Sequence, residues 1–241
     1  MRLLLILLLI LQTNTLKANE INYLLNIPNL EVYKLNNANK LKYLSAKNNF
    51  KIGINNNITC DKTSKESLKK NFPLIKKNLE IYKSEFLKKI NLRFIVLCEN
   101  LFISKINTAG IPDHKKRTLI LDLKFNEKYF ERAIHHEVFH IIHDSYKKIF
   151  DEKVWSSFNN KEFQYAECST CSDRLGLDLY YETSGFLTEY SKSIPSEDMA
   201  EVYSFLMTNK INIKNKSKKD SILSNKVKFI EYGINKIKNF K

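Results

Sequence analysis

The residues best suited to chemistry lie in one short stretch, His136-Glu137-Val138-Phe139-His140. Two histidines four residues apart lie above one another on one face of an α-helix, so both imidazoles can reach a single Zn²⁺ ion. Glu137 follows the first histidine directly and lies beside that face, where it can take the proton of a metal-activated water. The pattern therefore predicts a catalytic zinc site with Glu137 as general base. A core helix whose histidines bond only to the backbone is the alternative interpretation.

Two neighbouring histidines are poor candidates for further zinc ligands. His135 points about 100° away from His136 around the helix, which favours a surface position or an outer supporting role. His143 lies one turn beyond His140, but three ligands along a straight helix span about 10 Å and cannot converge on one ion. The positions three and six residues after His140 hold His143 and Tyr146 instead of the Gly and His of metzincins. A third ligand must therefore come from elsewhere in the chain.

If the site resembles that of thermolysin, this ligand is a glutamate on a later helix, and a later pair of glutamates is the candidate. Of the glutamates that follow the motif, only Glu197 has a second carboxylate one helical turn further on, at Glu201. Such a carboxylate can accept the free N–H of a ligand histidine and fix its orientation. We therefore predict His136, His140 and Glu197 as zinc ligands, with Glu201 as the orienting group. The reverse assignment, with Glu201 as the ligand, and an ordinary exposed acidic helix start are the alternatives.

Composition limits the class of protein. The chain has 241 residues, 43% of them hydrophobic, with five glycines and four prolines, which excludes collagen-like and disordered proteins. Its formal net charge is +14, supplied by 35 lysines and only five arginines. Recognition of phosphate and bases favours arginine, so we expect a solvated lysine surface and no nucleic-acid partner. A basic protein that associates with membranes or polymers through its lysines is a further alternative.

The N-terminal segment predicts export. Met1 and Arg2 precede an unbroken apolar run over residues 3–11, and the small residue Ala18 follows. This arrangement is typical of a cleaved signal peptide over residues 1–18, and nine apolar residues are too few for a membrane span. We expect a secreted protein, extracellular or periplasmic, without a stable membrane span after cleavage. An uncleaved signal anchor is the alternative.

Export also affects the interpretation of the cysteines. Four cysteines in an oxidising compartment can form two disulfides. The short spacing of Cys168 and Cys171 favours a local bridge between them, which leaves Cys60 to pair with Cys98. A structural zinc site at the CxxC would need a second pair of ligands that the sequence lacks.

The order of predicted elements indicates an α+β fold. Strand patterns occur at residues 30–34, 50–54, 92–98 and 118–123, and a polar loop at 107–117. Helical patterns cover residues 64–90, where Pro73 must lie near the start or kink the helix, and residues 127–146, 195–207 and 220–238. We predict a small mixed sheet, an HExxH helix and C-terminal helices. Residues 19–90 would pack as an N-terminal region on a catalytic domain formed by residues 91–241.

The motifs together resemble a known group of enzymes. HEVFH is followed about 50 residues later by a Tyr-containing segment and the helix start Glu-Asp-Met-Ala-Glu. This arrangement resembles the gluzincin metallopeptidases related to the anthrax lethal factor catalytic domain, the Pro-Pro endopeptidases and the bacterial putative zinc-binding metallopeptidases. The resemblance covers about residues 90–210. It implies a thermolysin-like core, a Zn²⁺ cofactor and a protein or peptide substrate.

The resemblance also implies a second catalytic residue. In that group a tyrosine seven residues before the ligand glutamate stabilises the oxyanion, and here that position is Tyr190. A tyrosine that only packs is the alternative. Two features depart from lethal factor: the residues around Glu197 are not aromatic, and Cys168 and Cys171 are an unexpected addition. Substrate specificity therefore cannot be transferred from any one member.

The sequence thus predicts an exported, monomeric zinc metallopeptidase. We expect an extended substrate to pair with the strand at 118–123, as an edge strand, with Ala109 and Gly110 on the rim. The alternative is an exported, non-catalytic binding or adhesion module with a vestigial HExxH.

Overall fold

The computed structural model describes residues 27–35, 37–169 and 173–239. The predicted signal peptide lies outside these residues. Within them eight strands form one mixed sheet, and helices follow the last strand. The strands are β1 (Leu30–Lys34), β2 (Lys42–Ala46), β3 (Phe50–Ile52), β4 (Ile58–Asp61), β5 (Phe94–Ile103), β6 (Ile106–Asn107), β7 (Gly110–Asp113) and β8 (Thr118–Asp122). The helices are α2 (Lys65–Glu80), α3 (Ser84–Lys89), α4 (Glu127–Ser145), α5 (Glu152–Ser156), α6 (Pro195–Thr208), α7 (Lys210–Ser217) and α8 (Ser221–Asn239), with the 3-10 helices η1 (Ile54–Asn56) and η2 (Tyr190–Lys192).

Strand β5 organises the sheet. Its first half lies parallel to β2 on one side and to β8 on the other. Its second half pairs antiparallel with β4 and β6. Strand β1 extends the sheet beyond β2, and β7 extends it beyond β8. This mixed sheet, followed by several helices, confirms the predicted α+β class.

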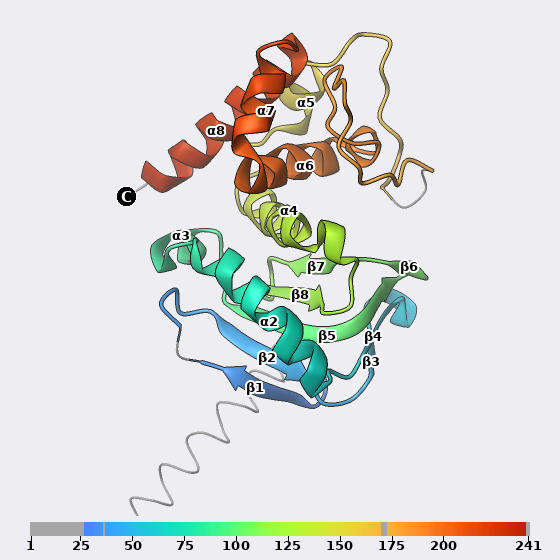
Figure 1. The fold of residues 1–241 in the computed structure, drawn as a ribbon, viewed down its shortest axis with the longest axis vertical. Coiled ribbons are helices and arrows are strands. Elements are labelled where there is room, and N and C mark those ends of the chain that lie inside the picture. The colour runs from blue at the N-terminus through green and yellow to red at the C-terminus, as the bar shows by residue number, and fades with distance from the viewer. Residues whose placement is uncertain (1–26, 36, 170–172, 240–241) are drawn as a thin grey trace, which may run out of the picture.

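The two faces of the central strands enter different cores. Ile95 and Leu97 of β5 belong to the larger core, which the helices share, whereas Phe94 and Val96 face a smaller core on the other side. The alternation follows from the two-residue period of a strand. In Figure 1, α4 lies between the sheet and α6, so this helix is packed on both sides.

The single helix predicted for residues 64–90 is wrong, because the structure has two helices there. The chain leaves the helix after Glu80 and begins α3 at Ser84, with Lys83 in an extended conformation. The apolar repeat continues across this break because both helices bury residues in the same core, so the spacing does not reveal it. Pro73 lies in the middle of α2, so of its two predicted placements the one near the helix start is wrong.

The edge strand is also different from the predicted one. β8, at residues 118–122, lies between β5 and β7 and is fully buried, so it cannot accept a substrate strand. The edge is β7, inside the segment predicted as a loop. Gly110 and Pro112 indicate a loop because both disfavour strands, but an edge strand tolerates proline where its N–H needs no partner.

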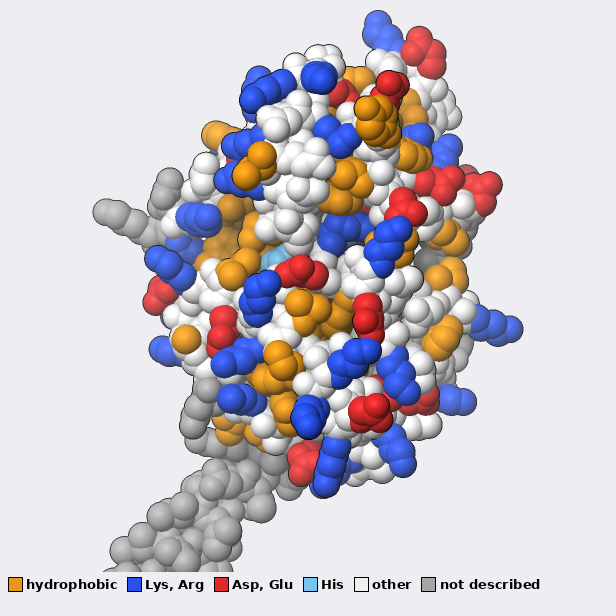
Figure 2. All heavy atoms as spheres, viewed as in Figure 1, with side chains coloured by type: hydrophobic (Ala, Val, Ile, Leu, Met, Phe, Trp, Pro, Cys, Tyr) orange, Lys and Arg blue, Asp and Glu red, His pale blue; other side chains and the backbone are white. Residues whose placement is uncertain are grey.

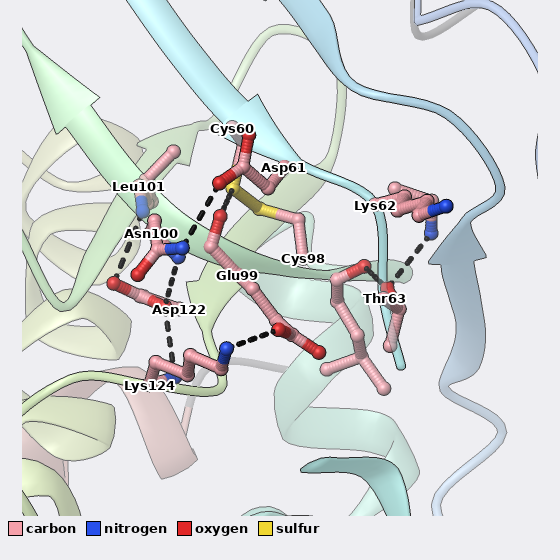
Figure 3. The surroundings of a disulfide bond; sticks show 12 residues. Cys60, Asp61, Lys62, Thr63, Cys98, Glu99, Asn100, Leu101, Asp122 and Lys124 are labelled. Carbon is pink, nitrogen blue, oxygen red and sulfur yellow. Dashed lines mark hydrogen bonds and ion pairs between the residues drawn. A yellow bond between two sulfur atoms is a disulfide. The ribbon is translucent and has the colours of Figure 1, made fainter. Parts of the chain in front are cut away.

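The predicted disulfide between Cys60 and Cys98 is confirmed, and it joins β4 to β5. Figure 3 shows its surroundings, where Glu99 lies next to the bridge. The Glu99 carboxylate accepts hydrogen bonds from the Ser64 backbone N–H (2.6 Å) and from Lys124 (2.9 Å). Ser64 is the N-cap of α2, so this carboxylate connects the sheet to the start of that helix. The other predicted bridge depends on Cys171, which lies outside the described residues.

The lysine side chains do not form a single patch on the face drawn in Figure 2, where they alternate with acidic side chains. None of the helices in the described part of the chain is long and apolar enough to span a membrane.

Replacing Glu99 with glutamine should change how stability depends on pH. Burial raises the pKa of Glu99, but the bonds from Ser64 and Lys124 outweigh this and lower it to about 2, below the usual 4.5. Between these values the unfolded chain binds more protons, so the stabilisation present above pH 4.5 is lost as the pH falls. Urea unfolding across pH 2–7 should show a shallower acid decline in Glu99→Gln than in the native protein. If the unfolding free energy of Glu99→Gln fell with pH in parallel with that of the native protein, the prediction would be contradicted. Glu31→Gln, at an exposed side chain, serves as the control.

Candidate metal centre

Helix α4 presents the HExxH residues from a rigid support. The helix starts at Asn126, whose side chain accepts a hydrogen bond from the Lys128 N–H. Its apolar side is fully buried through residues including Ile134, Val138 and Ile141. Because that side faces the core, His136 and His140 are held on the side that faces α6. The two imidazole centres lie 4.9 Å apart.

Helix α6 brings Glu197 to the same point. Its Oε2 lies 2.8 Å from His136 Nε2 and 3.1 Å from His140 Nε2, and the two Nε2 atoms are 3.1 Å apart. Zinc bonds of about 2.0–2.1 Å in a tetrahedron place ligand atoms about 3.3 Å apart. The three atoms therefore lie close to three corners of a zinc tetrahedron. Two imidazoles and one carboxylate form the ligand set of catalytic zinc sites that keep the fourth position open, so these residues fit the metal.

Charge pairing holds the three groups together. Burial would lower the pKa of His136, but its hydrogen bonds to Glu197 and Glu201 outweigh this and raise it to about 10. Burial would likewise raise the pKa of Glu197, but the neighbouring imidazoles hold it far below its usual range. Glu197 is therefore ionised at neutral pH. Because a ligand histidine must be neutral, metal binding releases a proton from this cluster.

Glu201 lies where the predicted orienting role requires it. Its Oε1 accepts a hydrogen bond from His136 Nδ1 at 2.9 Å, which leaves Nε2 pointing toward Glu197. The same carboxylate accepts bonds from the Arg132 guanidinium and from Thr188 Oγ1 (2.7 Å). Sequence reasoning missed both of these partners. Arg132 could have been found, since it lies one turn before His136 on the same helix.

Tyr190 lies beside the donor atoms at the start of η2. Its ring stacks at 5.9 Å from the His136 ring. Burial and the negative charges of Glu197 and Glu137 raise the pKa of Tyr190 well above its usual value of 10. The hydroxyl therefore stays protonated and can donate a hydrogen bond.

Glu137 is buried between α4 and the edge strand. Burial is the main cause that raises the pKa of Glu137 to about 7, while the charges of His136 and His140 oppose the change. Strand β7 approaches the Glu137 side chain closely because residue 110 is glycine. A Cβ at Gly110 would lie 2.8 Å from Glu137 Cγ and 2.8 Å from the Ile120 carbonyl oxygen. No larger residue fits there without displacing the glutamate or the sheet.

All of these groups open into one cleft of about 470 Å³. Strand β7 forms one wall, α4 forms the floor, and Leu175 and Leu177 form part of the opposite wall. Arg132 holds that wall in place by donating to the Leu177 carbonyl oxygen at 2.9 Å. The cleft thus combines a metal donor set, a buried carboxylate and a protonated tyrosine beside the edge strand β7.

A protein-family model described as putative zinc-binding metallo-peptidase matches residues 62–238. The chain belongs to this family. The match runs from the residues before α2 almost to the end of α8, so it contains both helices of the metal centre. A search of curated proteins finds no significant match. Membership supports a peptidase role and is consistent with a site that can hold a metal.

The other two histidines of α4 lie outside the donor set. His135 is buried and not on the surface: its Nδ1 lies 2.7 Å from the Tyr82 hydroxyl and its Nε2 lies 3.0 Å from Asn78 Oδ1. Burial lowers the pKa of His135 to about 4, so the ring is neutral and joins α4 to α2. His143 Nε2 faces Glu152 at 3.5 Å, away from the donor atoms.

Zinc content should separate the roles of the two glutamates. We expect about one zinc per chain, which Glu197→Ala should largely lose because it removes a ligand atom. Glu201→Ala should weaken zinc affinity by about 10- to 100-fold because it only frees the His136 ring. Metal analysis after dialysis against a competing chelator measures both, with exposed Glu182→Ala as the control. If the two variants exchange behaviour, the ligand assignment is wrong.

Proposed function

We propose that this protein is an exported zinc metalloendopeptidase of the gluzincin type that hydrolyses peptide bonds in a protein or peptide substrate. The observation that supports this most strongly is the convergence of His136, His140 and Glu197 in a cleft that also contains Glu137. A metal held only for structure has no need of an adjacent carboxylate or an open cleft.

The residues of the cleft suit the chemistry of peptide hydrolysis. Zinc, when bound, polarises the scissile carbonyl and lowers the pKa of water. Glu137, which is buried beside the donor atoms, accepts the proton of the attacking water and delivers it to the leaving amine. The protonated Tyr190 hydroxyl donates a hydrogen bond to the developing oxyanion. Glu201 orients the His136 imidazole through its bond to Nδ1.

Export is supported by two separate features. The first is the signal-like N-terminal sequence, and the second is the buried disulfide between Cys60 and Cys98. Disulfides persist in oxidising compartments and are rare in the cytosol. We therefore place the protein outside the cytoplasm, in the extracellular space or the periplasm.

Strand β7 offers the backbone of the substrate a pairing partner. Asp122 N–H donates to the Ala109 carbonyl oxygen (2.9 Å), so alternate residues of β7 direct their polar groups toward β8. Among the intervening residues, Gly110 directs its N–H and carbonyl to the free edge, where the carbonyl oxygen also accepts a bond from Thr108 Oγ1 at 3.1 Å, and Pro112 directs only a carbonyl oxygen there. An extended substrate can add there as an antiparallel strand, the commoner type of pairing.

The direction of β7 determines which side of the cut occupies which end of the cleft. The end of β8 leads directly into α4, so α4 runs alongside β7 in the same direction (Figure 1). An antiparallel substrate therefore runs against α4. Its residues after the scissile bond lie over the start of α4, and its residues before the bond lie toward Asp144.

The end of the cleft that receives the residue after the cut is lined mostly by apolar side chains, beside the mutually paired Arg132 and Glu201. Its lining combines side chains of α4 and the preceding turn with the opposite wall: Phe125, Tyr129, Ala133, Leu175 and Leu177. The small side chain of Ala133 leaves room on the floor. We therefore propose cleavage before a large apolar residue.

Substitutions at Glu137 and Tyr190 should reduce catalysis without releasing the metal. Glu137→Gln should lower kcat by about 10²- to 10⁴-fold, because the general base is lost. Tyr190→Phe should lower kcat by about 10²- to 10³-fold through loss of the oxyanion donor. Steady-state kinetics on a quenched peptide, with zinc content measured in parallel, tests both. A Glu137→Gln protein with full zinc and unchanged kcat would show that Glu137 is not the base, whereas a native protein with full zinc and no peptidase activity would identify a binding module with an unused motif.

Filling the apolar end of the cleft should change the preferred cleavage site. Ala133→Leu should reduce cleavage before Phe or Leu by about 10- to 200-fold relative to cleavage before Ala, since the added side chain takes the space. Mass spectrometry of a digested peptide library gives the preference. Exposed Glu127→Leu, on the same helix, is the matched control, because Glu127 pairs with Lys70 of α2 and does not line the cleft. If the change instead affects the residue before the cut, the substrate runs in the opposite direction.

A further inference from the structure

Lys226 of α8 is a fully buried lysine that no step of the proposed reaction uses. Its exposed fraction is 0%, and its ammonium group lies 3.8 Å from the centre of the Phe186 ring. It donates two hydrogen bonds, to Asp198 Oδ2 at 2.7 Å and to the Gly185 carbonyl oxygen at 2.8 Å. These two acceptors belong to separate segments that both lead to the metal centre.

The first acceptor fixes the start of α6. Asp198 follows Glu197 directly and is also 0% exposed. The same Oδ2 atom accepts bonds from Trp155 Nε1 (2.9 Å) and from the Tyr165 hydroxyl (2.6 Å). The side chains of residues 197 and 198 leave the helix about 100° apart. Holding Asp198 on one side therefore sets the rotation of the first helical turn, and with it the position of Glu197.

The second acceptor fixes the turn before Tyr190. Gly185 accepts from Lys226, and its N–H donates to Asp220 Oδ2 at 2.6 Å. The turn lies directly against α8, because a Cβ at Gly185 would lie 2.7 Å from Ile222 Cγ2. The chain then passes through Thr188, which donates to Glu201, and reaches Tyr190. Movement of this turn would move both the oxyanion donor and a support of His136.

We propose that Lys226 is a positioning residue, which sets Glu197 and Tyr190 relative to one another from α8. The inference rests on the proposed zinc peptidase function, because only that function requires the two groups to be aligned. Stability does not explain the arrangement, since a buried ion pair is often no more stabilising than apolar residues of similar volume. A single ammonium that bonds to both segments removes their freedom to shift independently.

The test compares two ways of removing the ammonium. Lys226→Met leaves the Asp198 charge buried without its cation, so this variant should be less stable. The double variant Lys226→Met/Asp198→Asn removes both charges and keeps the protein folded. Lys89→Met is the matched control, because Lys89 also anchors α8 but donates to carbonyls at its far end, those of Ile237 and Lys238. Each is made in the full mature chain, and folding is checked by circular dichroism.

The double variant should bind zinc about 10-fold more weakly and, at saturating zinc, show a kcat about 10-fold lower, with KM within about twofold. The visible spectrum of its Co²⁺ form should differ from that of the native protein, because the ligand geometry has changed. Lys89→Met should alter none of these properties. A folded double variant with native zinc affinity, kcat and Co²⁺ spectrum would overturn this inference but not the proposed function. A native protein that binds no zinc would overturn the proposed function and this inference with it.

Discussion

Helix α6 buries three carboxylates within five residues, and the surrounding structure supplies their partners. Glu197, Asp198 and Glu201 are each at most 8% exposed. A buried carboxylate without a partner costs several kcal/mol, so the helix can occupy this place only if other elements bring cations and donors to it. Arg132 from α4 and Lys226 from α8 do so, and the two HExxH imidazoles meet the third carboxylate. The packing of three helices is thus tied to the neutralisation of the first turns of α6.

The pairing between α4 and α6 also fixes how the helices align. Arg132, His136 and His140 lie at successive turns of α4, and Glu201 and Glu197 lie one turn apart on α6. Arg132 meets Glu201, His136 meets both carboxylates, and His140 meets Glu197. A shift of either helix by one turn would leave a buried charge unpaired at one end. The metal donor set is therefore the middle part of a longer row of charge pairs between α4 and α6. These pairs fix the alignment of the two helices.

Sequence reasoning located the groups whose relation is local. The spacing of His136 and His140, and that of Glu197 and Glu201, follows from one helical turn, and the structure brings all four residues together. Sequence reasoning missed distant partners whose position in the chain has no local spacing pattern. The pair of Asp198 with Lys226 spans 28 residues, and no periodic pattern marks a lysine as buried in a chain with 35 of them. The same limit applies to the break between α2 and α3, where both helices continue one apolar repeat.

The edge strand shows why a functional segment can look like a loop. Gly110 allows β7 to lie against Glu137, and Pro112 removes an N–H that another strand could use. A short edge strand with proline is also protected from pairing with a second copy of the protein. These residues lower the strand propensity of the segment, which made it resemble a loop. They nevertheless serve an edge that must stay unpaired until an extended chain enters the cleft, so the weak strand signal and the proposed substrate site have the same physical cause.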